Sequence, residues 1–327
     1  MGNVRSRCYQ GGVLHAEDFA LGEVSDHLGE PDTIVWVDIV DATAEDLAPL
    51  AAELGLHELA VEDALEPHQR SKVDWYPSHL FVACHAVRLD GAGAGDRLAR
   101  TEIDAFVGTR WVVTARTSDH YSIERVLQRW DNGPELLAKG AGVMMYALLD
   151  DIVDGYFDVV DQIDGYFERI ADTIFAEHPL DRETQRAWYE MRRALSQFHR
   201  LVLPLREALN GLVRHQHEIV QPDVLPYWQD LYDHVLVVSE TTESLRETAS
   251  SLVEANLSLR DYRQNLVMKK VSSWAAIVAA PTLVTGYYGM NVPFPGSGET
   301  AGVVAASLIM VAVSACLFLL FRAREWL

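Results

Sequence analysis

Two apolar runs near the C-terminal end of the chain contain no charged residue. The first covers residues 271–288 and the second covers residues 300–321. Their lengths of 18 and 22 residues match the roughly 20 residues that a helix needs to cross the hydrocarbon core of a bilayer. We therefore predict two membrane spans, at 271–290 and 300–321, joined by a short loop.

Basic residues flank the two predicted spans on one side only. Lys269 and Lys270 precede the first span, Arg322 and Arg324 follow the second, and the connecting loop has no lysine or arginine. Under the positive-inside rule, this asymmetry places both termini in the cytoplasm. The expected location is therefore the cell membrane, which the chain crosses twice.

The part of the chain before residue 139 mixes strand and helix patterns. Runs rich in β-branched and aromatic residues, which are typical of strands, occupy residues 33–40, 79–89, 102–107 and 111–115. Apolar residues with helical spacing occupy residues 44–56 and 123–130. A glycine-rich run at 91–95 is expected to form a hairpin turn between two strands. Residues 1–138 should therefore form an α/β cytosolic domain.

Long helices dominate the pattern after that point. Residues 144–177 and 182–215 are the first two, and Pro204 should kink the second. Between Pro226 and Pro281 lie 54 residues with neither glycine nor proline. They would make a helix of about 80 Å at about 1.5 Å per residue. We expect residues 139–270 to form a helical funnel whose last helix runs on into the pore region, residues 271–327.

One face of this last helix differs from the rest. A row of acidic, polar or small residues, which we call the polar stripe, recurs at alternating gaps of four and three: Glu254, Ser258, Asp261, Asn265, Met268, Ser272, Ala275, Ala279, Thr282, Gly286 and Gly289. The average gap of 3.5 residues is the repeat of a left-handed supercoil. The polar stripe therefore predicts a face that meets the same face of other copies.

Two interpretations fit the polar stripe. Small residues let membrane helices pack closely, which would make it only a packing seam. A water-filled pore is the other interpretation, because close packing would bring the carboxylates of Glu254 and Asp261 together, whereas water and cations relieve such repulsion.

The net charge, the cysteine spacing and the lack of catalytic motifs exclude several classes of function. The formal net charge of −21 argues against binding nucleic acid, which requires a basic face. The three cysteines, at 8, 84 and 316, are spaced too widely for a disulfide framework or a zinc site. No phosphate-binding loop, nucleophile elbow or zinc-protease motif occurs, so enzyme activity is not expected. The carboxylates of helix 144–177 are expected to form a solvated face opposite an apolar row. The alternative interpretation is that this acidic face attracts cations to the outside of the funnel.

The first span ends in Gly289-Met290-Asn291, preceded by Tyr288. In this, the chain resembles the CorA family of divalent-cation transporters, whose signature is Gly-Met-Asn near the C-terminus. Similar segments include Val61-Glu62-Asp63 and Tyr232-Asp233-His234. The resemblance implies a homopentamer with an α/β cytosolic domain, a funnel of long helices and two membrane helices per subunit.

The resemblance also implies roles for individual residues. Asn291 would form the ring at the pore entrance, Met268 and Val271 the hydrophobic gate, and Thr282 a polar ring. Glu254 would form an acidic ring in the funnel. Asp230 and Asp63 would lie at subunit interfaces, where cytoplasmic Mg²⁺ closes the channel.

The transported ion stays open at this point. Mg²⁺ is favoured, but Co²⁺, Ni²⁺ and Zn²⁺ remain alternatives, because the loop after the signature lacks the family's usual Met-Pro-Glu-Leu and carries only Glu299 as an acid. A zinc transporter of the same superfamily, with or without coupling to protons, is therefore one alternative. A membrane-anchored scaffold that conducts no ions is the other.

Overall fold

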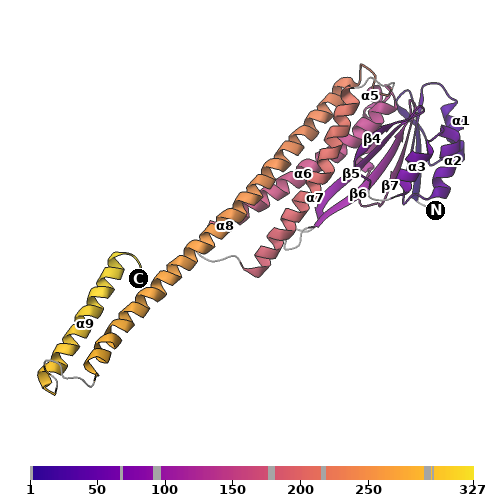
Figure 1. Cartoon of the computed structure of the whole chain (residues 1–327). Coiled ribbons are helices and arrows are strands. Elements are labelled where there is room, and N and C mark those ends of the chain that lie inside the picture. Colours follow the sequence, from indigo (N-terminus) through magenta and orange to yellow (C-terminus); the bar gives the residue numbers. More distant parts are fainter. Residues whose placement is uncertain are drawn as a thin grey trace. The chain divides into compact units, whose positions relative to one another are not determined.

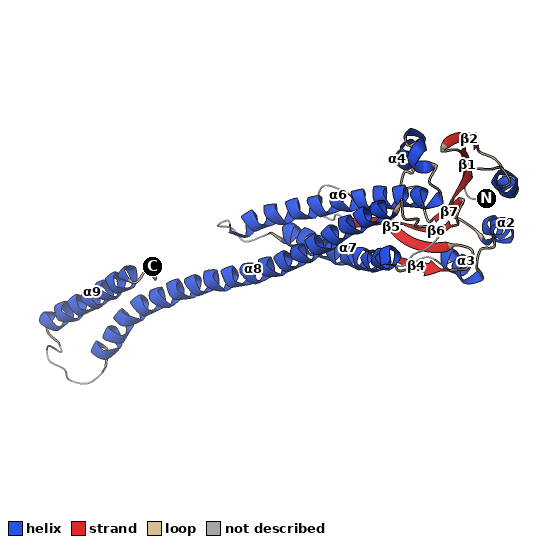
Figure 2. Ribbon diagram, turned by 90° about the horizontal axis from the view of Figure 1, so that it is seen from above, coloured by secondary structure: helices blue, strands red, loops and turns tan. Residues whose placement is uncertain are grey.

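The computed structural model describes residues 3–66, 69–90, 97–175, 181–214, 219–290, 296 and 298–327. An antiparallel and parallel mixed sheet comes first in the chain, and long helices follow it (Figures 1 and 2). The chain divides into two compact units, Met1–Ser250 and Ser251–Leu327. The division falls within one helix, so each unit is described in turn below.

The strands are β1 (Asn3–Gln10), β2 (Val13–Glu17), β3 (Thr33–Val40), β4 (Lys72–Trp75), β5 (Leu80–Asp90), β6 (Arg97–Val107) and β7 (Trp111–Arg116). The helices are η1 (Leu21–Glu23), α1 (Val24–Leu28), α2 (Ala44–Leu54), α3 (Glu58–Leu65), α4 (Glu124–Asn132), α5 (Pro134–Leu137), α6 (Ala141–Phe175), α7 (Arg182–Arg214), α8 (Leu225–Tyr288) and α9 (Thr300–Ala323).

The seven-stranded sheet has the order β2-β1-β3-β7-β6-β5-β4. Strands β3 and β7 pair in parallel, and every other neighbouring pair is antiparallel. The expected hairpin turn at 91–95 lies outside the described residues. The strands on either side of it, β5 and β6, do pair along their whole length, from Leu80 opposite Val107 to Asp90 opposite Arg97.

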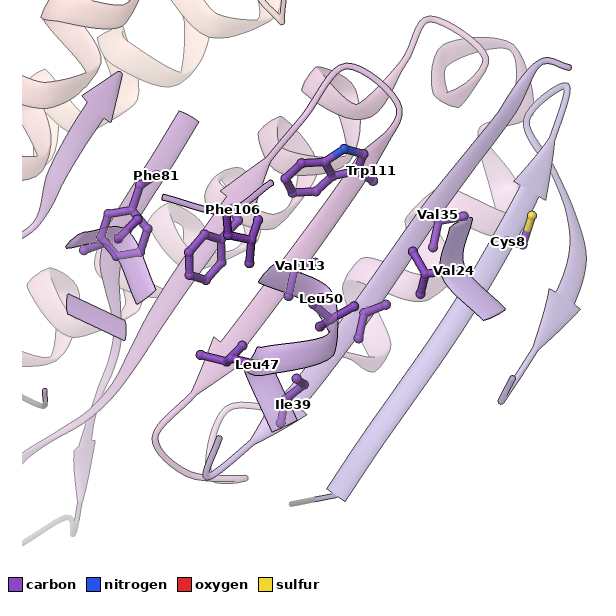
Figure 3. Packing of buried hydrophobic residues seen from close by; sticks show 14 residues of the cluster. Cys8, Val24, Val35, Ile39, Leu47, Leu50, Phe81, Phe106, Trp111 and Val113 are labelled. Carbon is purple, nitrogen blue, oxygen red and sulfur yellow. The ribbon is translucent and has the colours of Figure 1, made fainter. Parts of the chain in front are cut away.

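One face of the sheet packs against α1, α2 and α3. Alternate residues of a strand point to the same face, so Val35, Val37 and Ile39 of β3 all enter this core. Leu47 and Leu50 of α2 meet them there, and both are fully buried (Figure 3). The β-branched run of β3 therefore supplies the centre of the first core.

The other face of the sheet packs against α4 and α6. Trp36, the β3 residue between Val35 and Val37, is fully buried and lies edge-on to Trp130 of α4, with ring centroids 5.2 Å apart. Tyr156 of α6 donates a 2.6 Å hydrogen bond to the carbonyl oxygen of His85 on β5. These contacts fix α4 and α6 onto the sheet.

Helix α6 has the amphipathic pattern expected for residues 144–177. Its apolar row is buried from Val153 to Ile174, whereas Asp154, Asp158 and Asp161 are exposed. The acidic row is therefore a solvated face in this chain. Helix α7 contains Pro204 in its interior, as expected.

The elements expected from the sequence are present, with boundaries that differ by a few residues. The expected α/β unit, the long helices and two apolar C-terminal helices are confirmed. Strands β1, β2 and β4 are not predicted from the sequence. Strand β2 is short and mostly exposed, and β4 has only four residues. Strand β1 contains mainly polar or small residues. Such segments lack the β-branched run that marks β3.

Two helices of the described chain, α8 and α9, are long and apolar enough to cross a membrane. In the second unit, α9 runs beside the last part of α8 in both views (Figures 1 and 2). Near the start of α9, Gly302 meets Gly296 so closely that a Cβ on Gly302 would lie 2.3 Å from the Gly296 carbonyl oxygen. Of the three cysteines, Cys8 and Cys84 are buried, whereas Cys316 on α9 is exposed.

Asp104 on β6 is a buried acid that makes the stability of the first unit depend on pH. Its side chain is 2% exposed. Burial first, and then Glu102 and Asp63, raise its pKa from 3.8 to about 8. Between those two pH values the folded chain holds a proton that the unfolded chain releases. The free energy of unfolding should therefore fall as the pH rises through this window.

Replacement of Asp104 by asparagine should remove this part of the pH dependence. We expect the urea midpoint of the unmodified chain to fall between about pH 5 and about pH 8 by more than that of Asp104→Asn. Equal slopes for the two proteins would show that Asp104 titrates alike in the folded and unfolded states.

Candidate ion path and cation site

The polar stripe lies on α8 within the second unit. Its residues from Glu254 to Gly289 are all exposed in the single chain. Met268 and Val271, the two predicted gate residues, are 56% and 60% exposed. Apolar side chains this exposed at the start of a membrane span can face lipid, water or another copy of the chain.

Buried positions on this part of α8 lie on another side. Ser273 is fully buried, although Ser272 and Trp274 beside it are exposed. Ile277 and Val284 are half-buried. At about 100° per residue, these two lie roughly opposite Ala279 and Gly286 of the polar stripe. Helix α9 therefore covers the side of α8 that faces away from the stripe.

A cavity between the two helices agrees with this placement. It has a volume of about 560 Å³, and Thr285 and Tyr288 of α8 face Val303 and Ala306 of α9 across it. Ala306 is buried. Apart from Gly289, which lines this cavity, the stripe remains uncovered because the chain's own second membrane helix packs against another side of α8.

Thr282 presents an oxygen acceptor on the stripe. Its hydroxyl donates a 3.1 Å hydrogen bond to the carbonyl oxygen of Val278, one turn earlier. Because the proton is used within the helix, the lone pairs of the hydroxyl oxygen are free to accept. A ring of such oxygens suits the water protons of a hydrated cation.

The signature segment follows directly after α8. The amide nitrogen of Gly289 donates to the carbonyl oxygen of Thr285 at 2.9 Å, and that of Met290 donates to Tyr287 at 3.3 Å. A Cβ on Gly289 would lie 3.0 Å from the Thr285 oxygen. Met290 is 55% exposed. Asn291, the predicted entrance residue, lies outside the described residues.

A candidate cation site lies in the first unit, between α6 and α8. Asp150, Asp230 and His234 each offer one ligand atom, and the three atoms lie within 4.8 Å of one another. His234 Nδ1 is 3.9 Å from an Asp150 oxygen, and its Nε2 is 3.9 Å from an Asp230 oxygen. Two carboxylates and an imidazole are a ligand set that a divalent cation can use.

Charge around this group is only partly balanced. Asp150 is buried and pairs with Arg129 through a 2.5 Å contact, whereas Asp230 is exposed. His234 Nδ1 is buried and has no hydrogen-bond partner within the described part of the chain. The His234 imidazole therefore lies between the Asp150 and Asp230 carboxylates, and its Nδ1 atom, which makes no hydrogen bond within the described residues, is near Asp150.

Sequence reasoning identified only one member of this group. Asp230 was predicted as a regulatory ligand. His234 follows it by four residues, a spacing that places two side chains on one helix face and could have revealed the pair. Asp150 interrupts the buried row of α6, between Leu149 and Ile152. Only its burial distinguishes it from the other carboxylates of that helix.

Asp63, the second predicted regulatory ligand, does not belong to this group. It lies on α3, and its carboxylate is 2.6 Å from Lys72 Nζ. Lys72 also pairs with Asp74 at 2.9 Å. In the single chain Asp63 is therefore neutralised by a lysine, and its predicted meeting with Asp230 of another copy stays a prediction.

A family model described as "CorA-like Mg2+ transporter protein" matches residues 31–323, which is most of the chain. The chain belongs to the CorA family. The family consists of transporters, so a divalent-cation transporter rather than an enzyme is confirmed. With its two apolar helices, this CorA-family chain is a membrane protein.

Three proteins that are similar to this CorA-family chain match it over most of their own length. The YfjQ protein of Bacillus subtilis is 29% identical over 292 residues, which cover 89% of each chain. The cobalt/magnesium transport protein CorA of Thermotoga maritima is 26% identical over 91% of this chain and 85% of its own. The solved CorA magnesium transporter of Methanocaldococcus jannaschii has the same fold, with a TM-score of 0.80 at 20% identity over 98% of both chains.

Proposed function

We propose that this protein conducts hydrated Mg²⁺ into the cytoplasm as one subunit of a homopentamer. The observation that supports this most directly is the polar stripe, which is exposed on the side of α8 away from α9. Two membrane helices of one chain cannot enclose a water-filled path. Copies that turn their stripes toward a common axis would enclose one.

The residues of the stripe suit a cation that keeps its water. Mg²⁺ dehydrates reluctantly and holds an octahedral shell, so small and hydroxylated positions such as Ala279 and Thr282 leave room for the whole shell. Met268 and Val271 are the candidate hydrophobic gate, because apolar constrictions close a pore by excluding water. Glu254 and Asp261 would attract cations at the cytoplasmic end.

The entrance is proposed to be a ring of Asn291 side chains. A neutral amide oxygen accepts hydrogen bonds from the waters of the ion without binding it as tightly as a carboxylate would. Lys269 and Arg322 flank the two spans, which supports an orientation with both termini in the cytoplasm. The signature would then face the outside.

The ion that the protein prefers is proposed to be Mg²⁺. Mg²⁺ is favoured, and competition of Co²⁺, Ni²⁺ and Zn²⁺ with Mg²⁺ uptake in proteoliposomes measures the order of preference. Absence of any ion flux under these conditions would favour the non-conducting scaffold instead.

Adjacent alanines on α8 offer a matched test of the pore. Ala279 belongs to the exposed stripe, and Ala280, about 100° further round the helix, is half-buried. In a Cys316→Ser background, a charged thiol reagent should block Mg²⁺ flux through Ala279→Cys and leave Ala280→Cys conducting. The other cysteines, Cys8 and Cys84, are buried. Equal block of both variants, or of neither, would contradict a pore along the stripe.

The group around Asp230 is proposed to sense cytoplasmic Mg²⁺. A bound cation offsets the repulsion between carboxylates and so favours the state in which they are close. Asp230→Lys supplies a fixed positive charge, so the closed state should need less Mg²⁺. We expect the protease resistance of the cytosolic part to depend less on Mg²⁺ in this variant.

Asp233→Lys is the matched control, because Asp233 is exposed on the same helix and outside the group. An unchanged Mg²⁺ dependence in both Asp230→Lys and Asp63→Lys would place the sensor elsewhere in the protein.

A further inference from the structure

Positive charge is concentrated on one helix of this acidic protein. Helix α7 carries seven arginines and three glutamates, although the whole chain has a formal charge of −21. Helix α6, which precedes it, carries eight carboxylates and one arginine. Such segregation creates a local field that attracts anions to a protein that otherwise repels them.

A cavity of about 660 Å³ opens beside α7. Arginines reach it from three separate segments, namely Arg70 from the chain before β4, Arg100 from β6 and Arg200 from α7. Gln69 and Gln197 add two amides to its wall. No aspartate or glutamate is among the described residues that line it, so the three arginines give the lining a net positive charge.

Two of these arginines have no partner among the described residues. Within the described ranges, Arg100 and Arg200 form neither an ion pair nor a hydrogen bond, and both are exposed. Arg70 Nη2 lies 3.1 Å from a Glu207 oxygen, with side chains 68% and 59% exposed. Exposed pairs of this kind are weak, so a stronger anion can replace Glu207.

The remainder of the wall is neutral. Burial first, and then Arg246, lower the pKa of His199, so its imidazole is uncharged near neutral pH and serves as a hydrogen-bonding group. Leu98 of β6 and Leu203 and Pro204 of α7 form an apolar side. The cavity therefore combines a guanidinium cluster with an apolar surface.

We propose that this cavity binds an organic or inorganic anion with two or more linked phosphates, of the size of a nucleoside polyphosphate. Guanidinium groups bind phosphate oxygens through paired hydrogen bonds, and arginine is favoured over lysine for this geometry. The cavity falls within the usual range of ligand sites, about 300–1,000 Å³. Its apolar side would accommodate the base and sugar of a nucleotide.

Binding of three probes to the full-length protein in detergent tests the proposal. The probes are ATP, pyrophosphate and adenosine, and Mg²⁺ is removed beforehand so that metal bridging cannot hold the phosphates. We expect ATP and pyrophosphate to bind and adenosine not to bind. Tighter binding of ATP than of pyrophosphate would identify the nucleotide as the source of the phosphates, and equal binding would identify an inorganic polyphosphate.

Arg100→Gln and Arg200→Gln should each weaken binding of ATP about tenfold, which corresponds to the loss of one charge-assisted contact. Arg193→Gln is the matched control, because Arg193 is exposed on the same helix and does not line the cavity. All three side chains are exposed, so the variants should fold. Absence of binding in the unmodified protein, or an equal loss in Arg193→Gln, would overturn the proposal.

Discussion

Replacement of Asn291 by alanine is expected to abolish selective Mg²⁺ uptake while assembly of the protein stays intact. The change removes the amide oxygen that is proposed to meet the water shell of the ion. Binding of a fully hydrated Mg²⁺ relies on such outer contacts, because the ion gives up its waters reluctantly. Uptake measured in proteoliposomes, together with the mass of the complex in detergent, checks both parts of the expectation.

Asn256→Ala provides the control for this experiment. Asn256 lies on α8 between the stripe residues Glu254 and Ser258 in sequence and is half-buried. Asn256→Ala therefore removes the same kind of side-chain amide at a position away from the proposed path. Normal uptake and ion preference in Asn291→Ala would remove Asn291 from the mechanism. A loss of the oligomer in that variant would assign the residue to assembly instead.

Loss of the Asp38 carboxylate is expected to produce the largest drop in stability. Arg116 on β7 donates three hydrogen bonds, of 2.9, 3.1 and 2.5 Å, to the carboxylate of Asp38 on the parallel strand β3. The Asp38 and Arg116 side chains are 1% and 6% exposed. Thr114 donates to the same carboxylate at 2.7 Å. Asp38→Ala leaves the Arg116 charge buried without its partner, which costs about 3–5 kcal/mol of unfolding free energy.

The exposed pair between Arg5 and Glu124 is the comparison for Asp38. Its atoms lie 2.5 Å apart, but the side chains are 44% and 55% exposed, so Glu124→Ala should cost at most about 1 kcal/mol. Urea unfolding followed by tryptophan fluorescence, to which the buried Trp36 and seven other tryptophans contribute, measures both variants. Similar losses of unfolding free energy in the two variants would show that the buried Asp38 pair does not contribute more to stability than the exposed pair.

The sequence predicted best where one physical requirement controls a long segment. A bilayer demands an uninterrupted apolar run, so α9 was expected at 300–321 and occupies Thr300–Ala323. The repeat of 3.5 residues similarly marked one continuous face of α8. Its residues are exposed in the single chain, and their place along a pore stays a prediction. Both patterns depend only on residues that are close in sequence.

Contacts between distant segments could not be predicted in the same way. The cation group joins Asp150 to Asp230 and His234 across 80 or more positions, and the arginine cavity joins three segments whose neighbourhood follows from the order of strands in the sheet. The spacing of residues along the chain predicts neither arrangement. Asn291 and the loop after it stay predictions, because they lie outside the described residues.

The exposure of its cysteines makes this protein suitable for labelling at a single site without any mutation. Because Cys8 and Cys84 are buried and Cys316 is exposed, a spin label added to the unmodified chain should attach at one position, on α9. In a symmetric ring of five such chains, electron–electron distances would fall into two populations, related as the diagonal of a regular pentagon is to its side. A ring of four would instead give the ratio between the diagonal and the side of a square. Labelling of Cys316 in the native protein would therefore report the number of subunits.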